Sequence, residues 1–285
     1  MSKLSPTMAR SSVDDRTISD FGTQWQRFQL DDEYYGSKEC LSDIFGPLLP
    51  IDDVREKKVG DIGSGTGRIV GMLLDSGASH VVAVEPSEAF EVLSNRFESQ
   101  PDKVELVRAR GEKIAESTDL DLVTSIGVLH HIVDPNPVIR AARKALKPGG
   151  RIIIWVYANE GNRLYLAIFG PLRKATQRLP DRVLYGLSSV LNIGVDGYLL
   201  LCRWLPMPMR RYFLDHLGRL NRDQRRLTVY DQLNPAHAKY YTGEEAKALL
   251  ADNGFSDVET YYRHGYSWTA TGIKPVPGGS ATGIR

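Results

Sequence analysis

A run of closely spaced glycines, Gly63, Gly65 and Gly67, follows an apolar segment that ends at Ile62. Glycine lets a ligand lie against the main chain, and it accepts dihedral angles that a Cβ atom would penalise. Where such a run leads into a helix, the first N–H groups of the helix attract a carboxylate or a phosphate. The run therefore predicts a ligand-binding loop between a buried strand and a helix that begins near Arg68.

The spacing of these glycines distinguishes two classes of ligand. A dinucleotide-binding fingerprint, G-x-G-x-x-G, that started at Gly63 would need a third glycine at position 68, where the chain has Arg68. The chain reads D-x-G-x-G-x-G instead, with Asp61 inside the motif. An NAD-dependent oxidoreductase is therefore the less favoured alternative.

Polar residues and glycines also stand at the ends of the next three predicted strands. Glu85 ends the second strand, where a carboxylate can accept hydrogen bonds from both hydroxyls of a ribose. Gly111 and Glu112 follow the third strand, and Gly127 follows the fourth. Because ligands of open parallel sheets bind beyond the carboxyl ends of the strands, we expect these residues to line one site.

Two adjacent histidines, His130 and His131, come soon after the fourth strand. Histidine titrates near neutral pH, so either side chain could accept a proton from a hydroxyl, an amine or an acidic carbon. The alternative is a hydrogen-bonded histidine that only shapes the loop. The 6 histidines of the chain form no other pair at ligand spacing, and we predict no metal site.

Alternating apolar and helical patterns supply the elements that carry these residues. Repeated strand and helix units predict right-handed crossovers and an α/β fold with a doubly wound, mostly parallel sheet. Asp134 and Pro135 are expected to open a helix as its N-cap and first helical residue. The predicted strands after the first are 80–85, 104–109, 120–126 and 151–156, and the predicted helices include 87–99.

The composition favours an intracellular enzyme. The 285 residues fit one domain with additions, and 36 Lys and Arg against 35 Asp and Glu give no overall charge that indicates nucleic acid. The two cysteines, Cys40 and Cys202, are far apart, which disfavours a disulfide framework. We find no signal-peptide pattern and no run of about 18 apolar residues, so we expect a cytoplasmic location.

Together, these landmarks resemble those of the class I, Rossmann-like S-adenosylmethionine (SAM)-dependent methyltransferases, in the branch that acts on small molecules and lipids. The likeness runs from Asp61 through Lys147-Pro148-Gly149-Gly150, with a weaker continuation over 240–274. It implies SAM as the cofactor and a seven-stranded sheet with an antiparallel last strand, closed by a hairpin of 256–262 and 266–273. The residues that it assigns to SAM binding are Asp61, Gly63, Ser64, Gly65, Thr66, Gly67, Glu85, Pro86, Gly111, Glu112 and Gly127.

The resemblance leaves the methyl acceptor open. SAM is already an activated electrophile, so aligning and desolvating a nucleophile can supply most of the rate. The chain has no Asn/Asp-Pro-Pro-aromatic tetrad after the fourth strand and no cysteine near strands four and five, which disfavours methylation of nucleic-acid bases. We expect an O, N or C nucleophile on a small or lipid-like acceptor. The alternative is a SAM-binding scaffold without catalysis.

Two segments precede the core, which we place at 55–157. Residues 1–17 are polar and rich in helix breakers, and we interpret them as a disordered arm. Residues 18–54 are expected to form a helical cover, with a helix from Ser37 to Phe45. The aromatic residues of this cover include Tyr34 and Tyr35. They either pack the cover onto the sheet or, as the resemblance implies, lie near the amino-acid end of SAM.

A long insertion over 158–235 separates the core from a C-terminal helix and hairpin at 236–274. Between residues 161 and 226 the chain has 12 Lys and Arg against 4 Asp and Glu. We expect an acceptor lid whose basic face recognises an anionic or membrane-associated substrate, or alternatively a helical subdomain or homodimer interface. Apolar helical pieces are predicted at 164–169, 183–191 and 198–205, broken by Pro171, Pro180, Pro206 and Pro208.

The C-terminal part of the chain has clear boundary signals. Thr242 and Glu245 have the spacing of a capping box, which predicts that a helix begins there and ends at Asn253-Gly254. Residues 275–285 are interpreted as a disordered tail.

Overall fold

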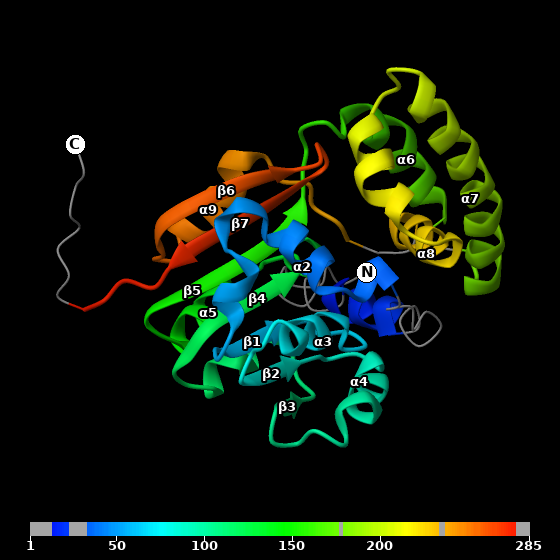
Figure 1. Ribbon diagram of the computed structural model, residues 1–285. Coiled ribbons are helices and arrows are strands. Elements are labelled where there is room, and N and C mark those ends of the chain that lie inside the picture. The colour runs from blue at the N-terminus through cyan, green and yellow to red at the C-terminus, as the bar shows by residue number, and fades with distance from the viewer. Residues whose placement is uncertain (1–12, 23–32, 177–178, 234–236, 278–285) are drawn as a thin grey trace, which may run out of the picture.

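This computed structural model describes residues 13–22, 33–176, 179–233 and 237–277. Within these ranges, seven strands form one sheet in the order β3-β2-β1-β4-β5-β7-β6 (Figure 1). β1 to β5 are parallel, and β7 pairs antiparallel with both of its neighbours. The predicted doubly wound sheet with an antiparallel last strand is therefore confirmed. The strands are β1 Lys58–Ile62, β2 His80–Val84, β3 Val104–Val107, β4 Leu120–Ile126, β5 Leu146–Tyr157, β6 Ser256–Arg263 and β7 Ser267–Ile273.

Helices cover both faces of this sheet. Val82 and Val84 of β2 pack into one hydrophobic cluster with α5 and α9, and Val81 and Ala83 pack into a second cluster with α2, α3 and α4. Because successive strand residues point to opposite faces, both sets must be apolar, which explains the continuous apolar runs in the sequence. The helices are α2 Lys38–Phe45, α3 Arg68–Asp75, α4 Ala89–Phe97, α5 Asn136–Ala145 and α9 Gly243–Ala251.

The caps of these helices mostly follow the sequence signals. Thr242 and Glu245 form the predicted capping box of α9. The start of α5 was predicted one residue too early, because Pro135 is its N-cap and Asn136 its first helical residue. Asp134 still satisfies this end of the helix, since its Oδ1 accepts a hydrogen bond from the N–H of Asn136 at 3.2 Å.

Residues 13–22 form a helix near the carboxyl ends of the central strands (Figure 1). Thr17 is buried, and the carboxylate of Asp14 accepts a hydrogen bond from the N–H of Val133 at 3.1 Å. The predicted disordered arm over 1–17 is therefore wrong for 13–17, because contacts with distant residues order a segment whose local composition is polar. Residues 1–12 and most of the predicted tail, 278–285, lie outside the described residues.

The insertion forms a helical layer of α6 Arg163–Thr176, α7 Asp181–Trp204 and α8 Arg222–Leu233, with short turns at 212–219. Figure 1 shows this layer on the side toward which the arrows of β4 and β5 point. Its own small core contains Leu184, Leu227, Tyr230 and Leu233. The positions of two predicted breaks were wrong: Pro171 lies inside α6, and the pieces at 183–191 and 198–205 belong to the single helix α7.

The α7 helix is unusually apolar for its length. The stretch Arg182–Trp204 has a mean hydropathy of 1.3, and 22% of its most apolar window is buried. By length and composition alone it could cross a membrane, a property that core helices of globular proteins also show. The sequence had been expected to contain no such stretch, because polar residues interrupt every purely apolar run.

Candidate functional site

A cavity of about 300 Å³ opens at the carboxyl ends of β1, β2 and β4, between the sheet, the N-terminal helix and the insertion. This volume lies at the lower end of the range for small-molecule pockets, roughly 300–1,000 Å³. Asp61 and Gly67 do not line the cavity, although the resemblance had assigned them to SAM binding. The assigned residues that do line it are Gly63, Ser64, Gly65, Thr66, Glu85, Pro86, Gly111, Glu112 and Gly127.

The glycine loop turns through left-handed backbone conformations. Gly63, Gly65 and Gly67 have φ angles of 76°, 55° and 87°. A Cβ atom on Gly63 would lie 2.4 Å from Val128 Cγ2, and one on Gly67 would lie 2.5 Å from the ring of Phe97. Gly67 is therefore required for packing at the start of α3, whereas Gly63 and Gly65 also form the cavity wall.

Glu85 is placed at the end of β2 to hold this loop. Its Oε2 accepts a hydrogen bond from the N–H of Gly65 at 2.9 Å, and its Oε1 accepts one from the N–H of Ser87 at 2.8 Å. Each carboxylate oxygen can accept a further bond. The side chain thus orders the loop and still offers acceptors to hydroxyl groups of a ligand in the cavity.

Asp61 lies under the loop and is 1% exposed. Its Oδ1 accepts a hydrogen bond from Thr124 Oγ1 at 2.8 Å, and its Oδ2 has no partner among the described residues. Burial raises the pKa of Asp61 to about 6, against the lowering effect of the Thr124 hydrogen bond. Its position indicates support of the loop from below rather than a contact with a ligand in the cavity.

The end of β3 contributes a tightly packed corner of the cavity. A Cβ atom on Gly111 would lie 2.8 Å from Ile62 Cγ2, which explains the need for glycine beside the sheet. Arg110 and Glu112 line the cavity, and Arg110 pairs with Asp15 of the N-terminal helix. That ion pair fastens the helix over residues 13–22 to this corner.

The two histidines occupy different places. His131 lines the cavity, and its Nδ1 lies 2.8 Å from the carbonyl oxygen of His237. Since a carbonyl can only accept, Nδ1 carries the proton, and Nε2 is the basic nitrogen of the neutral ring. His130 is fully buried and does not line the cavity, because its ring packs 4.0 Å from that of Tyr157 and 4.1 Å from that of His131. The expectation that either histidine could face an acceptor therefore has to be corrected for His130.

Aromatic side chains form the opposite end of the cavity. Trp155 and Tyr157 come from β5, Tyr212 and His216 from the insertion, and Tyr266 from the turn before β7. The His216 ring stacks on that of Tyr266 at 5.5 Å, and burial, followed by the Arg263 charge, lowers the His216 pKa well below its usual value. This end offers an aromatic surface, beside which the charged side chains of Asp231 and Arg263 also line the cavity.

A short polar network crosses this aromatic surface. The hydroxyl of Tyr157 donates to Asp231 Oδ2 at 2.7 Å and accepts from Gln232 Nε2 at 3.0 Å. Tyr240 stacks on Tyr157 at 5.3 Å and donates to Gln232 Oε1 at 3.3 Å. Residues of α8 are thereby fixed to β5, so the insertion is held against the sheet where a ligand would lie.

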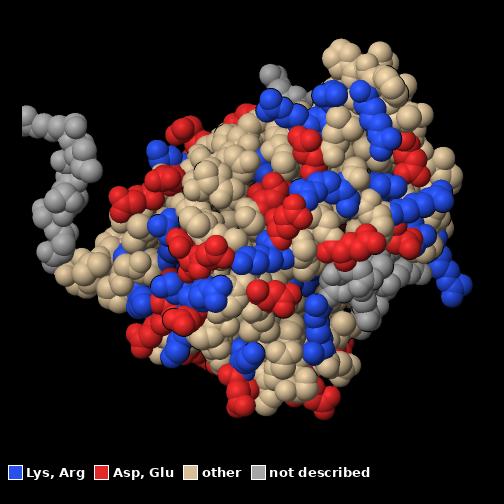
Figure 2. Space-filling view, viewed as in Figure 1, with Lys and Arg blue, Asp and Glu red and all other residues tan. Residues whose placement is uncertain are grey.

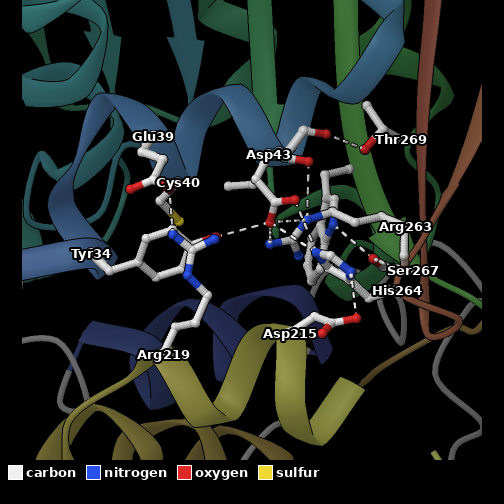
Figure 3. A network of polar contacts seen from close by, with 12 residues as sticks. Tyr34, Glu39, Cys40, Asp43, Asp215, Arg219, Arg263, His264, Ser267 and Thr269 are labelled. Atoms are coloured by element: carbon white, nitrogen blue, oxygen red, sulfur yellow. Dashed lines mark hydrogen bonds and ion pairs between the residues drawn. The ribbon is translucent and has the colours of Figure 1, made fainter. Parts of the chain in front are cut away.

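An ion-pair cluster ties three distant segments together beside the cavity (Figure 3). Asp43 of α2 accepts a hydrogen bond from Arg263 Nε at 3.0 Å, and His264 Nε2 lies 2.9 Å from its Oδ1. Arg263 is 1% exposed, and it also donates to the hydroxyl of Tyr266. Burial opposes ionisation of Asp43, but the hydrogen bonds and charges of His264 and Arg263 outweigh it and hold the Asp43 pKa well below its usual value.

Tyr34 belongs to this cluster rather than to the cavity wall. Its hydroxyl donates to Asp43 Oδ2 at 3.0 Å, and the Arg219 guanidinium of the insertion lies 3.7 Å above its ring. Tyr35 does line the cavity, with the Arg68 guanidinium 4.0 Å from its ring centre. Of the two aromatic residues expected near the amino-acid end of SAM, only Tyr35 reaches the cavity.

Several residues at the site were not predicted from the sequence. Arg263, His216 and Asp231 carry no local motif, and their places depend on how distant segments pack. Thr17 and Phe21 of the N-terminal helix are spaced four residues apart, which was the one available signal of a buried helical face.

Comparisons with known proteins show what the core of the chain is similar to. Residues 60–154 match the family model described as a methyltransferase domain. A tRNA U34 carboxymethyltransferase of Pseudoalteromonas atlantica is 29% identical over 115 residues, which are 39% of this chain and 35% of that protein. A ubiquinone biosynthesis O-methyltransferase of Pseudomonas entomophila is 33% identical over 118 residues, 40% of this chain and 50% of that protein.

The structure is also similar to the crystal structure of magnesium protoporphyrin IX methyltransferase from Synechocystis with bound S-adenosylhomocysteine (SAH). The match covers 94% of this chain and 99% of that protein's chain. At a TM-score of 0.53 and 15% identity it shows that the fold is shared. Residues 60–154 thus match a methyltransferase domain, and the chain is similar to class I SAM-dependent methyltransferases, whose cofactor is SAM. It spans between about a third and a half of the length of these curated relatives.

Proposed function

We propose that this protein transfers the methyl group of SAM to a small, partly apolar acceptor that lies in the same cavity as the cofactor. The observation that supports this most strongly is the continuity of that cavity. One end is formed by the glycine loop and Glu85, and the other by aromatic residues of β5 and the insertion. A cofactor and an acceptor could therefore lie end to end, shielded from water.

The glycine end has the features that SAM would need. Gly63 and Gly65 allow close approach to the main chain, and Glu85 can accept from the two ribose hydroxyls. Glu112 and Gly111 lie at the next strand end, where the family places the adenine, although Arg110 stands where many relatives have aspartate. Arg68 and Tyr35 lie on the cavity wall toward the N-terminal cover, where the amino-acid part of SAM would end.

The chemical step needs alignment and one proton acceptor. When bound, SAM would supply an activated methyl group to the acceptor nucleophile and would leave as SAH, its sulfur keeping the electron pair of the broken carbon–sulfur bond. The proton of an acceptor hydroxyl, amine or acidic carbon goes to Nε2 of His131, whose ring orientation is fixed by the bond from Nδ1 to His237. The aromatic wall orients the acceptor and excludes water.

The aromatic surface favours a flat or lipid-like acceptor over a nucleic acid. One relative acts, by its name, in ubiquinone biosynthesis, and another acts on tRNA. For this chain we favour the former kind of substrate, because helices of the insertion cover the acceptor end and the net charge is only +1. The insertion would then select the acceptor.

The proposal is tested first by calorimetry with SAM, SAH and NAD. We expect SAM and SAH to bind and NAD not to bind. Binding of NAD without binding of SAM would instead support the NAD-dependent oxidoreductase. Tritiated SAM is then incubated with the protein and a metabolite extract, and the label is followed into organic-soluble, water-soluble and RNA fractions. Label in RNA alone would overturn the small-molecule acceptor. SAM binding with no label in any fraction would favour the non-catalytic scaffold.

Replacing Glu85 by alanine is expected to weaken SAM binding by about 1.5–3 kcal/mol, the range for hydrogen bonds to a charged group. The loss has two sources, since the ribose loses its acceptors and the Gly65 N–H loses the bond that orders the loop. Calorimetry measures the change. Glu88→Ala is the matched control, because that side chain is exposed and pairs with Arg108 on the surface. Equal affinities for the two variants would mean that the ribose site has been misplaced.

Replacing His131 by alanine is expected to lower kcat by about 100-fold with little change in SAM affinity, as for loss of a general base. Steady-state turnover and calorimetry on the same preparation separate the two effects. His80→Ala at the start of β2 serves as the control, because it removes an imidazole far from the cavity. Unchanged turnover in His131→Ala would assign the ring a purely structural role.

A further inference from the structure

One face of α7 is apolar and turned away from the rest of the protein. Residues three, four and seven positions apart lie on one side of a helix. At these spacings α7 presents side chains that are between 45% and 82% exposed, namely Val183, Val190, Ile193, Leu200, Leu201 and Trp204. We call these six residues the outer face of α7. A contiguous apolar surface of this kind marks an interaction site in most proteins.

Glycines on the same side of the helix confirm that nothing covers this face within the described part of the chain. Ideal Cβ atoms built on Gly186, Gly194 and Gly197 would meet no atom within 4 Å. The opposite side of α7 is packed, since Leu184 and Cys202 are buried and Asn192 Nδ2 donates to the carbonyl of Arg222 at 2.9 Å. One side of α7 therefore packs against the rest of the insertion, and the other side is exposed to solvent.

The charged residues around this face are mainly arginines. Asp181 begins α7, and Asp196 is the single acidic residue between Arg182 and Trp204. Asp196 is half-buried and paired within the chain, since Arg225 Nη2 lies 2.9 Å from its Oδ1. Exposed arginines flank the outer face, with Arg182 at the start of α7 and Arg203 and Arg211 near its end. Figure 2 shows blue side chains beside tan surface, with some red ones between them, over the part of the molecule where the insertion lies.

We propose that the outer face of α7 docks on an anionic lipid bilayer and lies in the plane of the interface. An apolar helical face with an exposed tryptophan and flanking arginines has the composition of interfacial helices. The arginines would contact lipid phosphates, and each adds to binding at an anionic surface. Because the other side of α7 packs on α8, the helix lies along the bilayer instead of crossing it.

The same charges argue against a second copy of the chain as the occupant. If two outer faces pair in parallel, Arg203 lies near Arg203, and if they pair antiparallel, Arg203 lies near Arg182. In both arrangements two arginines come together, and Asp196 is already paired with Arg225 of its own chain. Asp181, next to Arg182, is the one acidic residue at an end of α7 that an antiparallel pair would bring to the level of Arg203. Like charges brought together in this way would weaken the pair.

Membrane docking goes beyond methyl transfer and does not depend on it. If the acceptor is lipid-like, docking would also set the cavity close to its source, because Met209 and Tyr212, which follow α7 directly, line the cavity. SAM affinity is measured separately, in solution without vesicles. A protein that binds SAM but no vesicles contradicts the docking proposal alone, and a protein that binds vesicles but no SAM contradicts the proposed function alone.

The test is co-sedimentation of the full chain with vesicles of phosphatidylcholine alone or with about one third phosphatidylglycerol. We expect binding to the anionic vesicles that weakens as salt is raised. The triple variant Val190→Gln/Ile193→Gln/Leu200→Gln should lower the partition coefficient by at least about tenfold, because three exposed apolar side chains are lost from the bilayer contact. Val276→Gln, which changes an exposed valine outside the insertion, should bind like the unmodified protein.

The electrostatic part is tested by Arg203→Gln/Arg211→Gln against the control Arg55→Gln/Lys57→Gln, a pair of exposed basic residues before β1. The first double variant should bind anionic vesicles about tenfold more weakly, and the control should not change. Equal SAM affinities show that all variants are folded. No binding to either vesicle would overturn the proposal, as would a dimer by light scattering that the triple variant converts to a monomer.

Discussion

Replacing Gly65 by valine is expected to lower the affinity of the protein for SAM by at least about 100-fold, while thermal unfolding stays cooperative. Gly65 lines the cavity at a φ angle of 55°, and its N–H donates to Glu85 Oε2. A branched side chain would occupy space that the ligand needs, and the backbone conformation would cost it about 1–2 kcal/mol. Calorimetry gives the affinity, and circular dichroism on heating gives the unfolding transition.

Gly149→Val is the matched control for this experiment. Gly149 has a φ angle of 78°, so valine there carries a comparable backbone strain, but only Val276 lies within 4 Å of its ideal Cβ. We expect Gly149→Val to lose some stability and to keep its SAM affinity. Equal losses of affinity in the two variants would show that backbone strain, rather than the ligand, requires glycine at position 65.

Replacing Asp43 by alanine is expected to lower the free energy of unfolding by about 3–5 kcal/mol, the range for breaking one side of a buried ion pair. Arg263 would remain charged and 1% exposed, without the carboxylate that receives its Nε hydrogen bond at 3.0 Å. Urea unfolding measures the change. Asp52→Ala is the control, because Asp52 is exposed and pairs with Lys38 on the surface, and it should unfold like the unmodified protein.

Acid titration gives an independent check on the Asp43 cluster. The folded-state pKa of Asp43 is depressed, so its contribution to stability is fully present above the pKa of the unfolded chain, about 4. That contribution is lost as the pH falls from about 4 through the folded pKa. The difference in stability between the unmodified protein and Asp43→Ala should therefore shrink as the pH falls below 4. A difference that stays constant down to pH 2 would mean that the carboxylate is not ion-paired in solution.

The sheet and the cofactor end of the site could be read from the sequence because their signals are local. The apolar runs that end at Ile62, Glu85 and Ile126 are each followed by glycines or polar residues, and the packing of parallel strands brings these ends together. The capping box at Thr242 likewise needs only residues three apart. In such segments, the local pattern and the tertiary fold favour the same conformation.

The acceptor end could not be predicted in this way, since its geometry depends on contacts between distant segments. His130 and His131 are neighbours in the sequence, and only packing against Tyr157 decides that His130 is buried. Arg263 lies on β6 and Asp43 on α2, 220 residues apart in the sequence. No sequence motif around either residue predicts the ion pair. Pro171 was predicted to end a helix, but it lies inside α6, where the surrounding structure tolerates a proline.

The position of β7 between β5 and β6 has a consequence for how the chain folds during synthesis. β6 precedes β7 in the chain but touches the sheet only through β7. Domains begin to fold from the N-terminus while the ribosome is still at work. β1 to β5 can assemble early, but β6 has no strand to pair with among the described residues until β7, which starts at Ser267, has left the ribosome. The Asp43 cluster requires Arg263 from β6, so this side of the cavity cannot close before β6 has been synthesised, and SAM would stabilise the closed state that binds it.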